Sequence, residues 1–104
     1  AFAGLWDRWR VPGETPLDTF TVLTTSANSL VAEVHARMPV ILREDDEALW
    51  LDPEADRESL AALLVPFPES PLRSYAVTPR VNFPENDDAA CVRAAEDTQP
   101  ELGL

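Results

Sequence analysis

Two apolar, aromatic segments separated by a strong turn signal open the chain, and this pattern constrains the fold more than any other feature. Phe2–Trp9 is apolar and aromatic, and Asp18–Thr25 alternates in the manner of a strand. Between them, Val11–Pro16 contains a Pro-Gly pair, which interrupts regular structure. Two such strands joined by a loop predict an antiparallel hairpin. Because an unpaired aromatic strand is an aggregation hazard, we expect a pairing segment upstream of Phe2.

The rest of the chain predicts short helices and strands in mixed order, which is typical of an α+β domain. The first expected helix has Leu30, Val31 and Val34 as its apolar stripe and Ser26 or Asn28 as its cap. The expected elements are helices at 28–35, 44–51 and 56–64, strands at 38–43 and 72–77, a proline-rich loop at 66–71 and an extended, turn-rich segment at 78–86.

Charge weakens a nucleic-acid-binding hypothesis without excluding it. The net charge is −11 at pH 7, whereas free-standing DNA-binding domains usually carry the opposite sign. Acidic and basic residues balance within residues 1–43, and the acidic excess lies in 44–58 and 85–101. All basic residues are arginines, the side chain best suited to forked phosphate contacts.

The length and the cysteine content indicate one cytoplasmic domain. A chain of 104 residues has room for a single core. The single cysteine, Cys91, excludes an internal disulfide and fits a reducing compartment. No apolar run is long enough to cross a bilayer, and the start does not resemble a signal peptide. We expect a domain over residues 1–86 and an acidic, flexible tail over residues 87–104.

His35 is the one residue whose surroundings suggest chemistry. It lies at the end of an expected helix, four residues after Val31 and therefore on the apolar side, and histidine changes charge near neutral pH. Arg37 follows, and Pro39 then favours extended backbone. The pattern indicates a proton donor or acceptor beside an anion-binding arginine. The alternative is a partly buried helix-end histidine and a solvated arginine, and spacing alone favours this alternative.

A family resemblance favours the chemical interpretation. Val34–Leu42, containing His35-Ala36-Arg37-Met38-Pro39, resembles the His-x-Arg-Met-Pro-Val-Ile-Leu signature of the SOS response-associated peptidase (SRAP) family. The resemblance implies an antiparallel, barrel-like sheet with short flanking helices, of which this chain would be an incomplete, C-terminal part. Other segments that resemble the family, in the same order, are Phe2–Trp6, Thr19–Thr25 with Ala27-Asn28, Trp50–Pro53, and Val77–Asn82 with Pro84 and Asn86-Asp87.

The resemblance implies covalent capture of abasic sites in single-stranded DNA during the DNA damage response, with associated peptidase activity. The implied nucleophile is an N-terminal cysteine, because its free amine forms a Schiff base with the sugar aldehyde and its thiol closes a thiazolidine ring. A glutamate in a Gly-Phe-Tyr-Glu-Trp-like motif, an asparagine and a histidine assist. Here residue 1 is Ala1, Cys91 lies in the acidic tail, and the glutamate motif is absent. We therefore expect no stable cross-link from this chain alone.

Five residues carry over from the family as site candidates. The resemblance implies that His35 is the general acid/base, that Arg37 contacts a phosphate, and that Thr24 forms hydrogen bonds near the site. Arg80 and Asn82 contact the DNA groove under the same interpretation, although a structural role in their turn is an equally good explanation.

A second hypothesis from another class is a non-catalytic binding module or one half of a split gene, in which the opening strand docks an N-terminal partner by strand addition. The acidic runs Asp45–Glu47 and Asp87-Asp88 lack the alternating ligands and glycine of a calcium loop. They are expected to be solvated, so neither a metal nor another cofactor is predicted.

Overall fold

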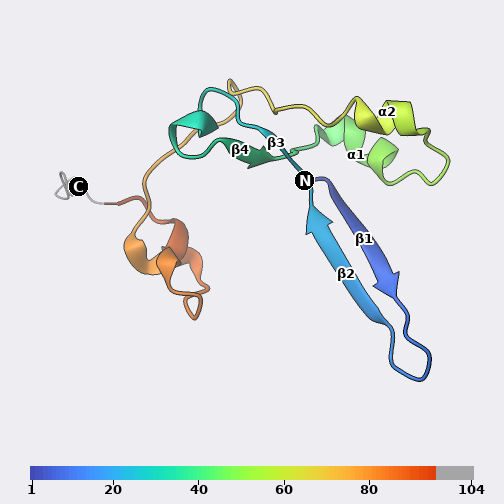
Figure 1. Cartoon of the computed structure of the whole chain (residues 1–104). Coiled ribbons are helices and arrows are strands. Elements are labelled where there is room, and N and C mark those ends of the chain that lie inside the picture. The colour runs from blue at the N-terminus through green and yellow to red at the C-terminus, as the bar shows by residue number, and fades with distance from the viewer. Residues whose placement is uncertain (96–104) are drawn as a thin grey trace. The chain divides into compact units, whose positions relative to one another are not determined.

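The computed structural model describes residues 1–95, and the chain divides into two compact units, Ala1–Arg73 and Ser74–Leu104. Short helices and two antiparallel two-stranded sheets make up the described part (Figure 1), which confirms the α+β prediction. The strands of residues 1–95 do not close into a barrel. Within the same residues, no helix has the length and apolar character that spanning a membrane requires.

The predicted hairpin is present, and in Figure 1 it projects from the rest of the first unit. Strands β1 (Gly4–Trp9) and β2 (Leu17–Val22) pair antiparallel, with Gly4 opposite Val22 and Trp9 opposite Leu17. Gly13 in the loop has a φ of 83°, a backbone conformation that glycine adopts without strain. The single strand expected over residues 18–25 is divided at Leu23, and its end belongs to a separate strand, β3 (Thr24–Ser26).

Backbone hydrogen bonds around Leu23 join three segments of the first unit. Strand β3 pairs with β4 (Arg37–Pro39), which begins one residue before the strand expected over residues 38–43 and ends well short of it; beyond Pro39 only Ile41 forms a bridge, with Phe2. Beyond that pairing, the amide of Leu23 donates to the carbonyl of Ala3 over 3.0 Å, and the amide of Val40 donates to the carbonyl of Leu23 over 2.9 Å. The chain start, Leu23 and Val40 are thus joined by backbone hydrogen bonds, although only β3 and β4 form a regular ladder here.

The core of the first unit consists of Ala3, Val40 and Leu42, against which Leu23, Trp50 and Leu63 pack. Trp50 and Leu63 come from the segments containing α1 (Glu44–Trp50) and α2 (Arg57–Ala61). Both helices were expected, and α2 is shorter than the predicted 56–64. It begins where it does because the Asp56 side chain accepts a hydrogen bond from the amide of Ser59 over 2.7 Å.

Replacing Gly4 by alanine is expected to destabilise the chain by about 1–3 kcal/mol, the usual cost of overpacking. An added Cβ would lie 2.9 Å from the backbone oxygen of Thr21 on the paired strand. The Gly4 carbonyl also accepts a hydrogen bond from Trp50 Nε1 over 3.1 Å, so a displaced strand would disturb this contact with α1. Urea denaturation measures the change, and an unaltered unfolding midpoint would contradict this account of the hairpin.

The helix predicted over residues 28–35 is wrong in extent. Only a 3-10 turn, η1 (Val31–Glu33), forms, and Val34 from the expected apolar stripe is 80% exposed. Ser26 pairs with Arg37, so the chain has to reverse direction within residues 27–36. Asn28 closes this reversal, because its Oδ1 accepts from the amide of Val31 over 2.9 Å.

The second unit, described from residue 74 to 95, contains two 3-10 turns, η2 (Pro79–Asn82) and η3 (Ala89–Val92). The strand predicted over residues 72–77 is wrong, since only Val77 forms a bridge, with Ala94. Two backbone hydrogen bonds accompany this bridge: the amide of Thr78 donates to the carbonyl of Arg93, and the amide of Ala95 donates to the carbonyl of Ala76. The expected tail over residues 87–104 stays a prediction, and its residues 96–104 lie outside the described residues.

Candidate functional site

The β3–β4 ladder places Arg37 and Thr24 on one face of the first unit. Arg37 is opposite Ser26 and Thr24 is opposite Pro39, so Arg37 and Thr24 are diagonal neighbours on the same side of the ladder. Met38, between Arg37 and Pro39, points the other way and is 2% exposed. This alternation turns Met38 inward and leaves Arg37 at the surface.

Arg37 is tied to Thr24 by two hydrogen bonds from one guanidinium nitrogen. Nη2 donates to the backbone oxygen of Thr24 over 2.9 Å and to its Oγ1 over 3.1 Å. Both side chains belong to exposed residues, so the guanidinium is positioned while staying accessible to an anion. Arg37 and Thr24, two of the predicted site residues, are therefore in direct contact.

His35 lies at the surface and contacts the main chain of Arg37. Its Nδ1 is 3.0 Å from the backbone nitrogen of Arg37 and 3.2 Å from the backbone oxygen of the same residue. The prediction that His35 faces the apolar side of a helix is wrong, because no helix extends to it and the residue is exposed. The structure brings His35, Arg37 and Thr24 together in one surface group.

Asn28 supports this surface group, a role that sequence analysis did not assign beyond helix capping. Its Nδ2 donates to the backbone oxygen of Phe67 over 2.7 Å, and its own amide donates to the sulfur of Met38 over 3.4 Å. The hydroxyl of the adjacent Ser29 hydrogen-bonds Glu69. The turn that leads to His35 is thus anchored both to β4 and to the loop after α2. An asparagine just before a turn is the sequence signal for such a role.

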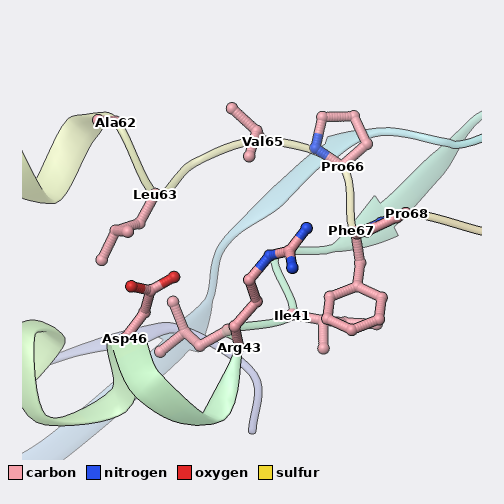
Figure 2. Close-up of a pocket in the computed structure, with 10 residues that line it drawn as sticks. Ile41, Arg43, Asp46, Ala62, Leu63, Val65, Pro66, Phe67 and Pro68 are labelled. Atoms are coloured by element: carbon pink, nitrogen blue, oxygen red, sulfur yellow. The ribbon is translucent and has the colours of Figure 1, made fainter. Parts of the chain in front are cut away.

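A pocket of about 230 Å³ lies between the segment after β4, α1 and the loop after α2 (Figure 2). The guanidinium carbon of Arg43 is 6.0 Å from the centroid of the Phe67 ring, a cation–π distance. Sequence analysis did not single out this pocket, and none of the five predicted site residues lines it.

Arg80 and Asn82 lie in the second unit. Arg80 forms a forked ion pair with Asp88, with Nε 3.1 Å from Oδ1 and Nη2 2.6 Å from Oδ2. Its backbone oxygen accepts from the Asn86 side chain over 2.9 Å, which gives Arg80 a structural contact in its turn. Asn82 is exposed in η2. The DNA contacts expected of both residues stay predictions.

Cys91, the only thiol of the chain, is 8% exposed in the second unit. Its sulfur lies 3.6 Å from the backbone oxygen of Asn86 and 3.7 Å from Oδ1 of Asp88. The thiol is therefore packed inside the same turn that holds the Arg80–Asp88 pair.

Acidification is expected to weaken the second unit through Asp88. Hydrogen bonds from the Arg80 guanidinium lower the pKa of Asp88 from its ordinary value of 3.8. A carboxyl whose pKa is lowered by folding stabilises the folded state above its unfolded pKa, and that contribution is lost as pH falls through the folded value. Asp88→Asn removes this dependence. As pH falls from neutral to acid, the free energy of unfolding should therefore decrease more steeply for wild type than for Asp88→Asn. Equal pH dependence in the two proteins would contradict a stabilising role of the Asp88 carboxylate.

The described fold is thus an α+β domain with a histidine and a clamped arginine beside one short antiparallel ladder. Residues 1–84 match the family described as SOS response associated peptidase (SRAP). The chain belongs to the SRAP family.

Named relatives and a solved structure are similar to this chain over nearly all of its length. Abasic site processing protein YoqW of Bacillus subtilis (strain 168) is 39% identical over 95 residues, which span 90% of this chain and 42% of that protein. Abasic site processing protein HMCES of Gallus gallus is 37% identical over 93 residues, 86% of this chain and 27% of that protein. A crystal structure of a Bacteroides thetaiotaomicron protein matches with a TM-score of 0.81 at 30% identity, over 91% of this chain and 43% of that one. This chain therefore spans less than half the length of each.

Proposed function

We propose that this chain takes part in abasic site processing, supplying the part of the site that contains His35, Arg37 and Thr24. The observation that carries the proposal is their grouping at one surface, with the Arg37 guanidinium tied to Thr24 and the His35 ring held at Nδ1. The names of the similar proteins YoqW and HMCES support abasic DNA as the target. We further propose that the DNA is single-stranded and that the protein acts in the cytoplasm.

The proposed chemistry assigns His35 the proton transfers of sugar ring opening. An abasic deoxyribose opens when the C1 hydroxyl gives its proton to water, the C1–O4 bond breaks, and O4 gains a proton. A protonated His35 delivers that second proton and takes one back in the reverse step. Arg37 holds the neighbouring phosphate, since a guanidinium matches phosphate geometry and stays charged.

The proposed nucleophile is not in this chain, because Cys91 is its only thiol and is both internal and buried. An internal cysteine has an amide nitrogen, which cannot form a Schiff base with an aldehyde. We therefore expect the 104-residue chain alone to form no SDS-resistant adduct with an abasic single-stranded oligonucleotide.

A chimaera tests the proposal directly. This chain replaces the matching segment of YoqW, with which it is 39% identical over 95 residues, so that the rest of the site comes from that protein. The chimaera is expected to form an SDS-resistant adduct with abasic single-stranded DNA and none with an undamaged oligonucleotide. A folded chimaera without an adduct, or an adduct from this chain alone, would overturn the proposal.

The hairpin favours a second candidate function, the docking of a complementing segment into a larger, barrel-like sheet. Trp6 and Phe20 face each other across the hairpin and are 70% and 81% exposed. Within residues 1–95, β1 and β2 pair only with each other, so each has one open edge. The other exposed large apolar side chains of the hairpin are Leu5, Trp9, Leu17 and Val22.

Co-expression tests the docking proposal. The part of YoqW outside the matching segment is produced as a tagged, separate chain beside this one, and the two are expected to purify together. Phe20→Lys, which places a charge beside the exposed ring of Trp6, is expected to abolish the association. Val34→Lys is the matched control, because Val34 is 80% exposed and lies outside the hairpin. Equal association of both variants would contradict docking on the hairpin.

A further inference from the structure

We propose that the main chain of Arg37 holds Nδ1 of His35 so that Nε2 faces the ligand as a hydrogen-bond donor in both charge states of the ring. We assign Thr24 as the positioning residue that keeps Arg37 in place. The inference rests on the proposed function, since it specifies the working nitrogen of the same group. It specifies which nitrogen of His35 has the proton and which residue, Thr24, holds Arg37 in position; family membership implies neither.

The first step concerns the two contacts of Nδ1. The backbone nitrogen of Arg37 lies 3.0 Å from Nδ1, and the backbone oxygen of Arg37 lies 3.2 Å from it. An imidazole nitrogen accepts when it has no proton and donates when it has one. In the neutral ring, Nδ1 accepts from the Arg37 amide; in the charged ring, Nδ1 donates to the Arg37 carbonyl. One nitrogen thus has a main-chain partner in either state.

The second step concerns the other nitrogen. A neutral ring that accepts at Nδ1 has its proton on Nε2, because the hydrogen bond at one nitrogen decides which nitrogen is protonated. A charged ring has protons on both nitrogens. Nε2 therefore has a proton in both states, no residue among 1–95 forms a hydrogen bond with it, and the residue is exposed. When the charged ring gives its Nε2 proton to the ligand, the neutral ring is left for a short time with its proton on Nδ1. Proton exchange with water then restores the favoured tautomer, in which Nε2 has the proton and Nδ1 accepts from the Arg37 amide.

The third step explains why Thr24 matters. Arg37 is the first residue of β4, and the ends of ladders open most readily. The two hydrogen bonds from Nη2 to Thr24 tie this end diagonally across the ladder. A fixed Arg37 main chain is what keeps both partners of Nδ1 in reach. Thr24 thus acts on His35 through Arg37, without a direct contact.

The test uses nitrogen NMR of the 104-residue chain, in which His35 is the only histidine and its ring signals are unambiguous. At a pH where the ring is neutral, we expect the ratio of the Nε2–H to the Nδ1–H tautomer to exceed that of a blocked free histidine by roughly threefold to tenfold, the effect of one hydrogen bond. A ratio equal to that of free histidine, or a majority of Nδ1–H, would overturn the proposal.

Variants test the positioning role in the same spectra. Arg37→Met removes both hydrogen bonds to Thr24 and is expected to return the tautomer ratio to that of free histidine. Thr24→Val removes only the hydrogen bond to the hydroxyl and is expected to lower the tautomer ratio part of the way. Thr24→Ser retains the hydroxyl and should keep the wild-type ratio. The controls Arg10→Met and Thr21→Val change the same residue types at exposed positions in or beside the hairpin. A wild-type ratio in Arg37→Met, with dispersed amide signals showing that it is folded, would refute the positioning role.

The two proposals fail separately, because this measurement needs no DNA. A chimaera that forms the adduct while the chain shows no tautomer preference refutes the inference and leaves the proposed function standing. A clear tautomer preference in a chain whose chimaera forms no adduct supports the ring geometry and refutes the proposed function.

Discussion

Replacing His35 by asparagine in the YoqW chimaera is expected to slow formation of the abasic-DNA adduct about 100-fold, the lower end of what a positioned acid/base group contributes. Asparagine keeps an acceptor near the Nδ1 position for the Arg37 amide, which lies 3.0 Å from Nδ1 in this structure. It has no group at the Nε2 position and does not change charge near neutral pH. The variant therefore removes the chemistry while it preserves the local hydrogen bond. Single-turnover quantification of the adduct on denaturing gels measures the rate.

Val34→Asn is the matched control for this variant. It introduces the same side chain one residue earlier, at a position that is 80% exposed, and the rate is expected to stay that of the unchanged chimaera. Binding of undamaged single-stranded DNA should be similar in both variants, because Arg37 remains. If His35→Asn formed the adduct as fast as Val34→Asn, His35 would have no part in proton transfer.

Replacing Met38 by alanine is expected to cost about 2–5 kcal/mol of folding stability, the largest stability effect that the structure predicts. Met38 is 2% exposed and, with Val40, is one of the two largest fully buried side chains in the described part. The variant leaves a cavity beneath β4 and removes the acceptor of the Asn28 amide hydrogen bond. Because small domains are only marginally stable, we expect a large fraction of the variant to be unfolded. Urea denaturation followed by tryptophan fluorescence measures the loss.

Met38→Leu separates packing from the sulfur contact. Leucine is similar in volume and lacks the sulfur acceptor, so its cost is expected to stay below about 1.5 kcal/mol. Equal losses for the alanine and leucine variants would show that the hydrogen bond, not the buried volume, is what Met38 contributes. Met38 lies between Arg37 and Pro39 in β4. The same variants therefore measure how far the stability of the strand that contains Arg37 depends on the buried Met38 side chain.

The hairpin and the two α-helices were predictable because their signals are local. The Pro12-Gly13 pair and the apolar segments on either side fix the hairpin before any tertiary contact is known. The start of α2 also follows from local chemistry, since Asp56 caps it, whereas its early end at Ala61 was not predicted. The break at Leu23 was not predictable, because it comes from backbone bonds to Ala3 and Val40, which are distant in sequence.

The predicted helix at 28–35 and the predicted strand at 72–77 were wrong because tertiary pairing outweighed local preference. Residues 28–35 have helical spacing, but between the paired Ser26 and Arg37 only a 3-10 turn forms. Residues 72–77 have strand-like composition, but their available partner contributes a single bridge at Ala94. Propensity is a weak predictor wherever the length of a connection is set by the elements on either side.

The sequence named His35, Arg37 and Thr24 as site candidates, a role that stays a prediction, whereas the contacts among them come from the structure. The family resemblance made His35 and Arg37 candidates for a shared site, but the contact between the ring and the Arg37 main chain depends on a side-chain rotation that no sequence pattern encodes. The link from Arg37 to Thr24 requires the register of β3 and β4. The pairing of Arg80 with Asp88 likewise depends on a turn that only the structure reveals.

The most direct measurement is a crystal structure of the chimaera joined to an abasic single-stranded oligonucleotide. We expect Nε2 of His35 within about 3.2 Å of an oxygen of the captured sugar, and the Arg37 guanidinium on an adjacent phosphate while it still contacts Thr24. A captured sugar on another face of the chain, with His35 turned to solvent and Arg37 away from the DNA, would contradict the account.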